Sequence, residues 1–210
     1  MEGLIRNVLW NSMLAMIPVF AAYGLKTLLA VRPTALLRYL LGSPLALVWF
    51  VFLPNTCYLL TEWRHYLLPL DAYNLYLRAG DDTMLLLRLV MGSLFYLLYA
   101  LFGMLAFTMA IRPVERMAIR RGVAVRFWAV PFFAAISLGV YLGLVLRFNS
   151  WDLATCPGQI WKATVEVGGR PLLALMILGF GAFLWASYEA LDIWLDGFKQ
   201  RLVKGKTTEA

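Results

Sequence analysis

The chain has 210 residues, of which 62% are hydrophobic and only 15% are charged, and its mean hydropathy is +0.73. Soluble domains are about half apolar and about a quarter charged, so this composition excludes an ordinary soluble domain. The net charge of +7 does not indicate nucleic-acid binding, because no basic run is interleaved with stacking aromatic residues.

Long apolar runs indicate helices that cross a lipid bilayer. Several runs reach the roughly 20 residues that span the hydrocarbon, and they are continuous rather than alternating, which favours helices over a barrel. We therefore predict an all-α, polytopic transmembrane helix bundle that forms a single integral membrane domain over residues 1–210. Its five spans are expected at about residues 8–25, 43–61, 84–111, 127–146 and 171–195, before a basic tail at residues 199–210.

The first span is expected to be retained rather than cleaved as a signal peptide, because basic residues follow it more than they precede it. Beyond it, Lys26, Arg32 and Arg38 lie among leucines. That mixture favours an interfacial amphipathic segment over residues 26–42 rather than a span.

The end of the second span is crowded with polar groups. Residues 54–65 read PNTCYLLTEWRH and directly follow the apolar run LALVWFVFL. If the helix continues, Asn55, Tyr58, Glu62 and His65 are three or four residues apart and share one face. Pro54 cannot donate a backbone hydrogen bond, so a kink or a free carbonyl is expected beside it.

The third and fourth spans add further candidates. Arg88 lies one turn inside the third span. In the fourth span, Ala135, Gly139 and Gly143 recur at every fourth residue, which either reflects scattered small residues or lets another helix approach closely. That helix could belong to a membrane-protein partner or to a second copy of the chain. The link after this span contains RFNSWD at residues 147–152.

The distribution of charge predicts the orientation. With five spans, twelve lysines and arginines fall on one side of the membrane and six on the other, Arg88 being inside a span. Basic residues gather on the cytoplasmic side, so we expect the amino terminus outside and the carboxyl terminus in the cytoplasm. Both polar stretches, residues 54–65 and 147–152, then face outward and can meet.

The two polar stretches also fit a known pattern, FLPNxxYxxT(D/E)xxH followed by (Y/G)LGxxxRxNSWD. It resembles an uncharacterised family of bacterial multi-span membrane proteins, a domain-of-unknown-function family. The matching residues are Phe52, Leu53, Pro54, Asn55, Tyr58, Thr61, Glu62 and His65, then Tyr141, Leu142, Gly143, Arg147, Asn149, Ser150, Trp151 and Asp152. Cys57 and Leu144 depart from it, where a proline and an arginine are frequent. The resemblance implies a bacterial inner-membrane location and gives no activity.

The ligand-binding candidates combine both stretches with the arginine of the third span. Ionisable groups at mid-bilayer cost roughly 2.5–3.5 kcal/mol on insertion scales, so they usually have partners and purposes. The favoured function is to bind a small ligand, a lipid headgroup or a metal at the outer face, or to support a membrane complex. The candidates are Asn55, Tyr58, Glu62, His65, Arg88, Arg147, Asn149 and Asp152.

A purely structural network would account for the same residues without a ligand. In it, Glu62 pairs with Arg88 or Arg147, Asp152 caps the segment that follows, and Asn55 satisfies carbonyls freed by the nearby proline. Each polar group would then serve only to hold the helices and loops in place.

The carboxylates and the histidine also suit a metal site or an enzyme. Glu62 and His65, at positions i and i+3, can share one divalent metal with Asp152 as a third ligand. The same three side chains could act as acid and base in a membrane enzyme of hydrolase or transferase type, working on a periplasmic or outer-leaflet substrate. The sequence assigns no catalytic residue and identifies no cofactor beyond this candidate metal.

Two further pairings stay open. Cys57 and Cys156 both lie on the expected outer side, where two separate thiols are the default and a disulfide is the alternative. Glu189, Asp192 and Asp196 share a face of the fifth span. Solvated helix-end charges are the simpler account of these carboxylates, and pairing with arginines of residues 112–126 is the alternative.

Overall fold

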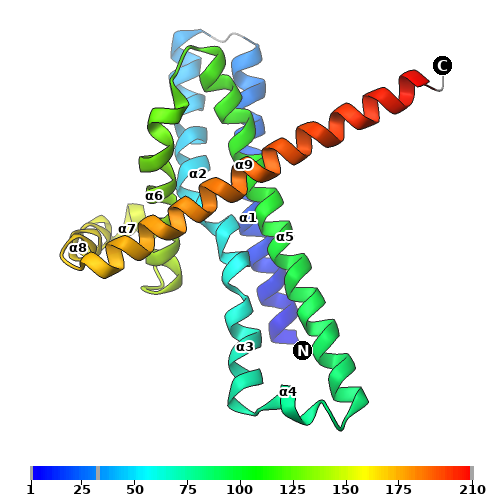
Figure 1. Ribbon diagram of the computed structural model, residues 1–210. Helices are drawn as coiled ribbons and strands as arrows, with labels where there is room; N and C mark the ends of the chain where they lie inside the picture. Colours follow the sequence, from blue (N-terminus) through cyan, green and yellow to red (C-terminus); the bar gives the residue numbers. More distant parts are fainter. Residues whose placement is uncertain (1, 32–33, 209–210) are drawn as a thin grey trace.

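The computed structural model describes residues 2–31 and 34–208, and the regular elements in this part of the chain are all helices (Figure 1). The prediction of an all-α fold is confirmed. The helices are α1 (Glu2–Ala30), α2 (Ala35–Thr61), α3 (Trp63–Ala72), α4 (Leu75–Arg78), α5 (Thr83–Arg120), α6 (Val125–Leu144), α7 (Asp152–Thr155), α8 (Pro157–Gly168) and α9 (Pro171–Thr208).

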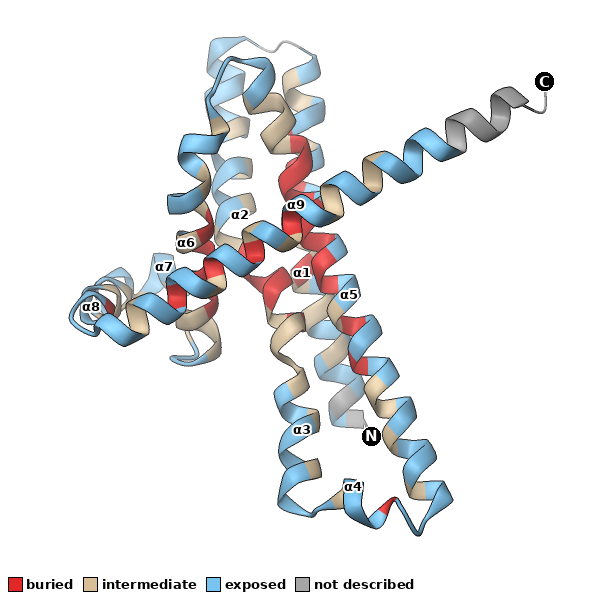
Figure 2. Cartoon of the chain, in the orientation of Figure 1, coloured by how far each residue is buried: buried red, intermediate tan, exposed pale blue. Residues whose placement is uncertain are grey.

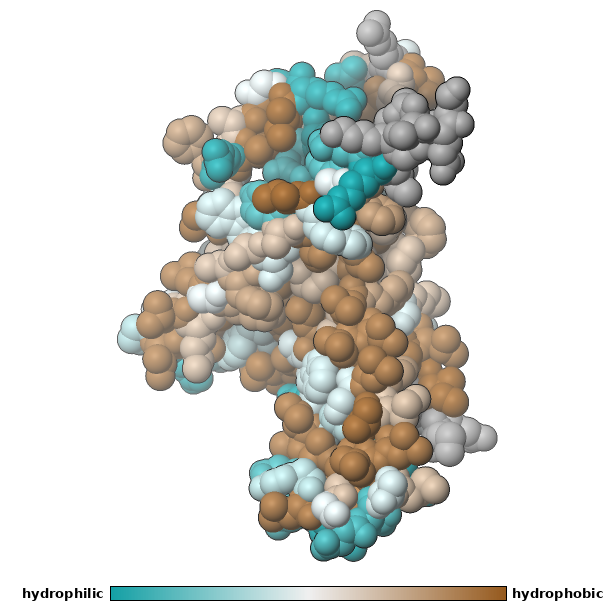
Figure 3. All heavy atoms as spheres, turned by 45° about the vertical axis from the view of Figure 1, so that its right-hand side comes forward, coloured by the Kyte–Doolittle hydropathy of each residue, from teal (hydrophilic) through white to brown (hydrophobic). Residues whose placement is uncertain are grey.

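Five helical stretches in the described part are long and apolar enough to cross a membrane, which confirms the predicted transmembrane bundle. Figure 3 shows apolar side chains over most of the visible face, with hydrophilic residues gathered toward its two ends. A bilayer has this order of polarity, so the chain has the character of a multi-pass membrane protein. The five stretches are Ile5–Ala30, Ala35–Ala72, Thr83–Arg120, Val125–Leu144 and Pro171–Arg201.

Four of the five membrane-spanning helices are longer than the spans expected from the sequence, whereas α6 has the expected length and begins two residues earlier. Residues 26–42 do not form a separate interfacial segment, because their leucines extend the end of α1 and the start of α2. Thr34 caps α2 by accepting a hydrogen bond from the backbone N–H of Leu37 at 3.4 Å. Arg32 lies outside the described residues. The basic tail continues α9 as far as Thr208, and residues 209 and 210 lie outside the described part.

A group formed by α1, α2 and α5 meets a second group, formed by α6 and α9, at the centre of the molecule. α1, α2 and α5 pack along one another, and α9 crosses obliquely over α5 and α6 (Figure 1). Buried residues concentrate where these helices cross (Figure 2). Phe107 of α5, Ile136 of α6, and Leu184 and Tyr188 of α9 are at most 2% exposed there and belong to one apolar core.

Small residues allow the close approach of these helices. A Cβ atom added to Gly103 of α5 would lie 2.7 Å from the carbonyl oxygen of Thr56 in α2. A Cβ atom added to Gly139 of α6 would lie 2.6 Å from Cγ of Pro54, also in α2. The small-residue face predicted on the fourth span therefore has a close neighbour within the same chain, and that neighbour is α2.

Candidate functional site

The polar end of the second span does not continue as one straight helix. α2 ends at Thr61, Glu62 forms the junction, and α3 starts at Trp63. Because of this break, Asn55 and Tyr58 face the end of α6 and the loop after it, whereas Glu62 faces α1. The expectation of a single four-residue face therefore requires a continuous helix that the structure does not contain.

Asn55 connects the two polar stretches. It is 5% exposed, and its Nδ2 donates to Oγ of Ser150 at 2.9 Å and to the carbonyl oxygen of Phe52 at 3.1 Å. Oγ of Ser150 also lies 3.3 Å from the carbonyl oxygen of Val51, to which it donates. A buried amide and a hydroxyl thereby donate to two backbone carbonyls in the turn of α2 that precedes Pro54. The two stretches meet although 95 positions separate these residues.

Tyr58 crosses from α2 to α6. Its hydroxyl donates to the carbonyl oxygen of Gly139 at 3.3 Å, and its ring end occupies the space that a Cβ atom of Gly143 would fill. The glycine spacing of α6 thus makes room for a tyrosine as well as for a neighbouring helix.

The loop after α6 is held by its own polar side chains. Arg147 adopts a left-handed backbone conformation with φ of 61°, and its side chain is exposed. The carboxylate of Asp152 accepts the backbone N–H of Asn149 at 2.6 Å and the hydroxyl of Thr155 at 3.3 Å. Asp152 therefore braces its own loop and the first turn of α7, rather than reaching toward the first polar stretch.

A groove of about 260 Å³ lies between α2, α6 and the α7–α8 segment, and we call it the α2/α6/α8 groove. Residues of both polar stretches line it, including Tyr58 from the first and Asn149 and Ser150 from the second. These polar residues form a small part of its wall, and most of the remaining lining is apolar. The apolar lining includes Phe50, Leu138, Leu142, Phe148, Leu153 and Ile160, and Thr164 of α8 adds a hydroxyl.

Glu62 and His65 form a second, smaller polar group. Oε1 of Glu62 accepts a hydrogen bond from Nδ2 of Asn11 in α1 at 3.3 Å, and Oε2 lies 3.8 Å from Nε2 of His65. Among the described residues, no hydrogen bond or ion pair joins either of them to Arg147 or Asp152. The predicted pairing of Glu62 with Arg88 or Arg147 is likewise absent from the described part of the chain.

The candidate metal ligands are not gathered together. Within residues 2–31 and 34–208, no group of three or more His, Cys, Asp or Glu side chains is arranged to hold a metal ion. Glu62 and His65 are neighbours, but Asp152 makes its hydrogen bonds inside the loop after α6. Cys57 and Cys156 are free thiols, Cys57 being buried, which agrees with the default expectation of two separate cysteines.

Among the described residues, the largest ionic network joins α5 to α9 where these helices cross, and we call it the α5–α9 clasp. Nε of Arg112 lies 2.7 Å from Oδ1 of Asp192, and Nη2 of Arg116 lies 2.7 Å from Oδ2 of Asp196. Arg112 also pairs with Asp196. The simpler account, in which these carboxylates are only solvated, is therefore wrong for Asp192 and Asp196. Pairing with the arginines is confirmed.

Sequence reasoning missed two contributions to these sites. Ser150 matched a motif but was not among the ligand candidates, although it bonds to Asn55 and lines the groove. Asn11, the partner of Glu62, received no role. An asparagine within an otherwise apolar first span was the available signal, because polar side chains in a bilayer seek partners.

Comparison with known proteins gives one match. The family model described as "Protein of unknown function (DUF1361)" matches residues 10–187. Among the curated proteins and among the solved structures, no match is found. The matched region begins in α1 and ends in α9, so it includes both polar stretches and the whole groove.

Proposed function

We propose that this chain, which belongs to the DUF1361 family of proteins of unknown function, binds a small amphipathic ligand in the α2/α6/α8 groove. The observation that carries the proposal is that both polar stretches line one groove of about 260 Å³. The volume is slightly below the roughly 300–1,000 Å³ of typical ligand pockets. A small solute, or the headgroup and first methylene groups of a lipid, would fit a site of this size.

The lining indicates how such a ligand would be oriented. Its polar part would lie beside Tyr58, Asn149 and Ser150, which offer hydroxyl and amide groups. Its apolar part would lie against side chains such as Leu138 and Ile160, whose burial supports binding at roughly 25 cal/mol per Å². Exposed Arg147 is placed in the same loop as Asn149, where its charge would favour an anionic group.

The charge asymmetry of the sequence supports an outer location for this groove. On the topology expected from the sequence, twelve basic residues belong to the side of the α5–α6 turn and six to the side of the groove, and basic residues mark the cytoplasmic side. We therefore place the ligand at the periplasmic or outer-leaflet side of a bacterial inner membrane. Glu62 and His65 lie beside Asn11 of α1 and are not part of this proposal.

Native mass spectrometry of the protein purified in a mild detergent tests this function. The wild type should carry a bound mass, and Leu142→Trp should lose it, because Leu142 lines the groove and the larger ring would fill it. Leu146→Trp is the matched control, since Leu146 lies in the loop just after α6, does not line the groove and is 41% exposed. Equal occupancy in the three proteins, or no bound mass in the wild type, would contradict the proposal.

A further inference from the structure

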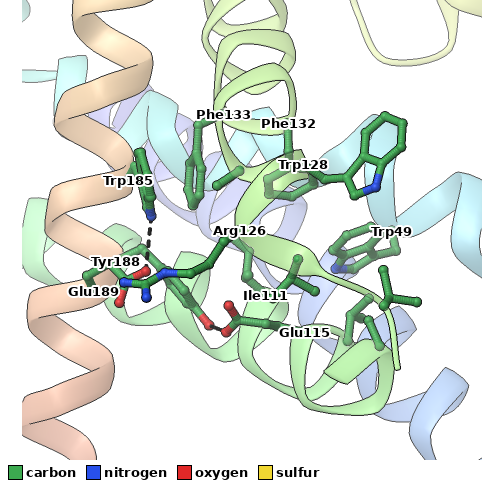
Figure 4. A pocket seen from close by; sticks show the side chains of 15 residues that line it. Trp49, Ile111, Glu115, Arg126, Trp128, Phe132, Phe133, Trp185, Tyr188 and Glu189 are labelled. Atoms are coloured by element: carbon green, nitrogen blue, oxygen red, sulfur yellow. Dashed lines mark hydrogen bonds between the residues drawn. The ribbon is translucent and has the colours of Figure 1, made fainter. Parts of the chain in front are cut away.

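A second cavity lies at the other end of the bundle, beside the α5–α6 turn, and we call it the aromatic cavity. It has a volume of about 230 Å³ and is lined by side chains from α2, α5, α6 and α9. Figure 4 shows aromatic rings along its wall and acidic side chains at its base. The rings belong to Trp49, Trp128, Phe132, Phe133, Trp185 and Tyr188.

Packing and hydrogen bonds hold several of these rings, although Trp128 is 67% exposed. Trp49 stacks on Phe132 with ring centroids 5.8 Å apart, and its indole N–H donates to the carbonyl oxygen of Ala110 at 2.8 Å. Phe133 stacks on Trp185 with centroids 6.3 Å apart. A wall of this kind is held in shape before any ligand enters, which lowers the ordering cost of binding.

Two carboxylates reach the cavity without a cationic partner. Glu115 of α5 accepts a hydrogen bond from the hydroxyl of Tyr188, and Glu189 of α9 accepts the indole N–H of Trp185 at 3.0 Å. Both carboxylates act as acceptors, and in the described part of the chain neither forms an ion pair, in contrast to Asp192 and Asp196 in the clasp. Glu115 is half-buried, so a negative charge on it is stabilised by a positive group nearby, whereas the exposed Glu189 adds negative charge at the mouth of the cavity.

Arg126 brings one positive charge of the chain itself to the cavity. It lines the cavity from the second residue of α6, and Figure 4 shows its side chain directed toward Tyr188 and Glu189. With the adjoining clasp included, three guanidinium groups (Arg112, Arg116 and Arg126) stand against four carboxylates (Glu115, Glu189, Asp192 and Asp196), which leaves one negative charge in excess. The electron-rich faces of the tryptophans attract a cation placed over them, and this attraction is larger where water is excluded.

From this arrangement we propose that the aromatic cavity binds a small organic cation, a quaternary ammonium or protonated amine, supplied as a free solute from the side of the α5–α6 turn. The apolar substituents of the cation would lie against the indole rings, and its charge would lie near Glu115 and Glu189. The site is separate from the α2/α6/α8 groove, so either proposal can fail without the other.

Calorimetric titration of the full-length protein in an uncharged detergent tests the proposal, with choline as the probe and its uncharged carbon isostere as the comparison. Choline should bind saturably and the isostere should bind at least about tenfold more weakly, since it lacks the charge that the carboxylates and rings recognise. Equal binding of the two compounds would show a merely apolar cavity and would overturn the proposal. Absence of saturable choline binding would overturn it as well.

Choline binding by variants of the acidic residues gives a second test of the proposal. Glu189→Gln, at an exposed position, and Glu115→Gln, which keeps an acceptor for Tyr188, should each weaken choline binding about five- to tenfold. Glu166→Gln on α8, outside the cavity, is the matched control and should bind like the wild type. Unchanged affinity in both cavity variants would overturn the assignment.

A bilayer experiment distinguishes a free cation from a lipid headgroup. Choline should bind with the same affinity in nanodiscs of phosphatidylethanolamine and of phosphatidylglycerol if the site takes a free solute. Loss of choline binding only in the ethanolamine lipid would contradict the proposed free ligand, because the lipid ammonium group would then occupy the cavity.

Discussion

At the scale of single residues, the position of α5 against α2 depends on Gly103. A Cβ atom there would lie 2.7 Å from the carbonyl oxygen of Thr56 and 2.8 Å from Cβ of Leu59. The first is a backbone atom and the second is the first atom of a side chain, so neither can move away by rotation of a side chain. Only a shift of one whole helix could relieve the overlap, and tightly packed interiors resist such shifts.

Gly103→Ala should therefore destabilise the protein by about 1–3 kcal/mol, the usual cost of overpacking a core. Thermal unfolding in detergent, followed by intrinsic fluorescence, measures the effect. Gly179→Ala is the control, because a Cβ atom at Gly179 of α9 meets nothing within 4 Å. Similar melting temperatures for the two variants would contradict the close contact of α5 with α2.

The chemistry of individual residues was only partly predictable from the sequence. Asn55 was expected to satisfy carbonyls freed by Pro54; it donates to the carbonyl of Phe52, whereas the carbonyl that loses its helical donor at Pro54 is that of Phe50. The bond of Asn55 to Ser150 could not be predicted from spacing, since it depends on where the loop after α6 returns to α2. The partners of Glu62 were wrongly expected to be arginines, because the break at this residue turns it toward Asn11 of α1.

At the scale of helices, the α5–α9 clasp fixes where α9 crosses α5. The side chain of Arg112 is only 10% exposed, and it contacts the carboxylates of Asp192 and Asp196. Arg116, at 40% exposed, contacts the same two carboxylates from a more solvated position. The buried arginine should matter more, because the loss of one partner of a buried pair leaves charge without compensation.

Arg112→Ala is expected to cost about 3 kcal/mol of stability, whereas Arg116→Ala should cost less than about 1 kcal/mol. Chemical unfolding curves of the two variants and the wild type, recorded in the same detergent, check this order. A result in which Arg116→Ala costs as much as Arg112→Ala would show that the depth of burial does not determine the strength of the clasp.

The length of the apolar runs predicted the number of helices better than the positions of their ends. Continuous apolar runs indicated the number of spans correctly, because a bilayer demands about 20 apolar residues per crossing. The ends were misplaced where leucines sit among charges, as in residues 26–42, since long basic side chains are tolerated at the end of a membrane helix. The oblique course of α9 had no signal in the sequence, because crossing angles follow from packing between distant helices.

At the scale of the whole molecule, the expected orientation has the α3–α4 side outside and the α5–α6 turn in the cytoplasm. Single cysteines in a background that carries Cys57→Ala and Cys156→Ala should report it. Asp81→Cys should react with a membrane-impermeant maleimide in intact cells, and Val123→Cys only after the membrane is opened, since both positions are exposed. The reverse pattern of labelling would show that the topology is inverted and that the groove lies on the cytoplasmic side.

Two polar stretches, far apart in the sequence, meet beside the α2/α6/α8 groove. Their closest link is the hydrogen bond of 2.9 Å between Asn55 and Ser150. Oxidative cross-linking in membranes tests this link most directly, using Asn55→Cys with Ser150→Cys in the background without native cysteines. A protease site inserted in the α5–α6 turn then cuts the chain between the two positions.

The account predicts that the two halves of the cut chain stay joined under oxidising conditions and separate after reduction. The matched pair Glu62→Cys with Ser150→Cys should separate under both conditions, because Glu62 faces α1 instead. Halves that separate in the Asn55 and Ser150 pair, while the uncut protein remains folded, would contradict the single site and leave the two stretches as independent networks at the ends of their helices.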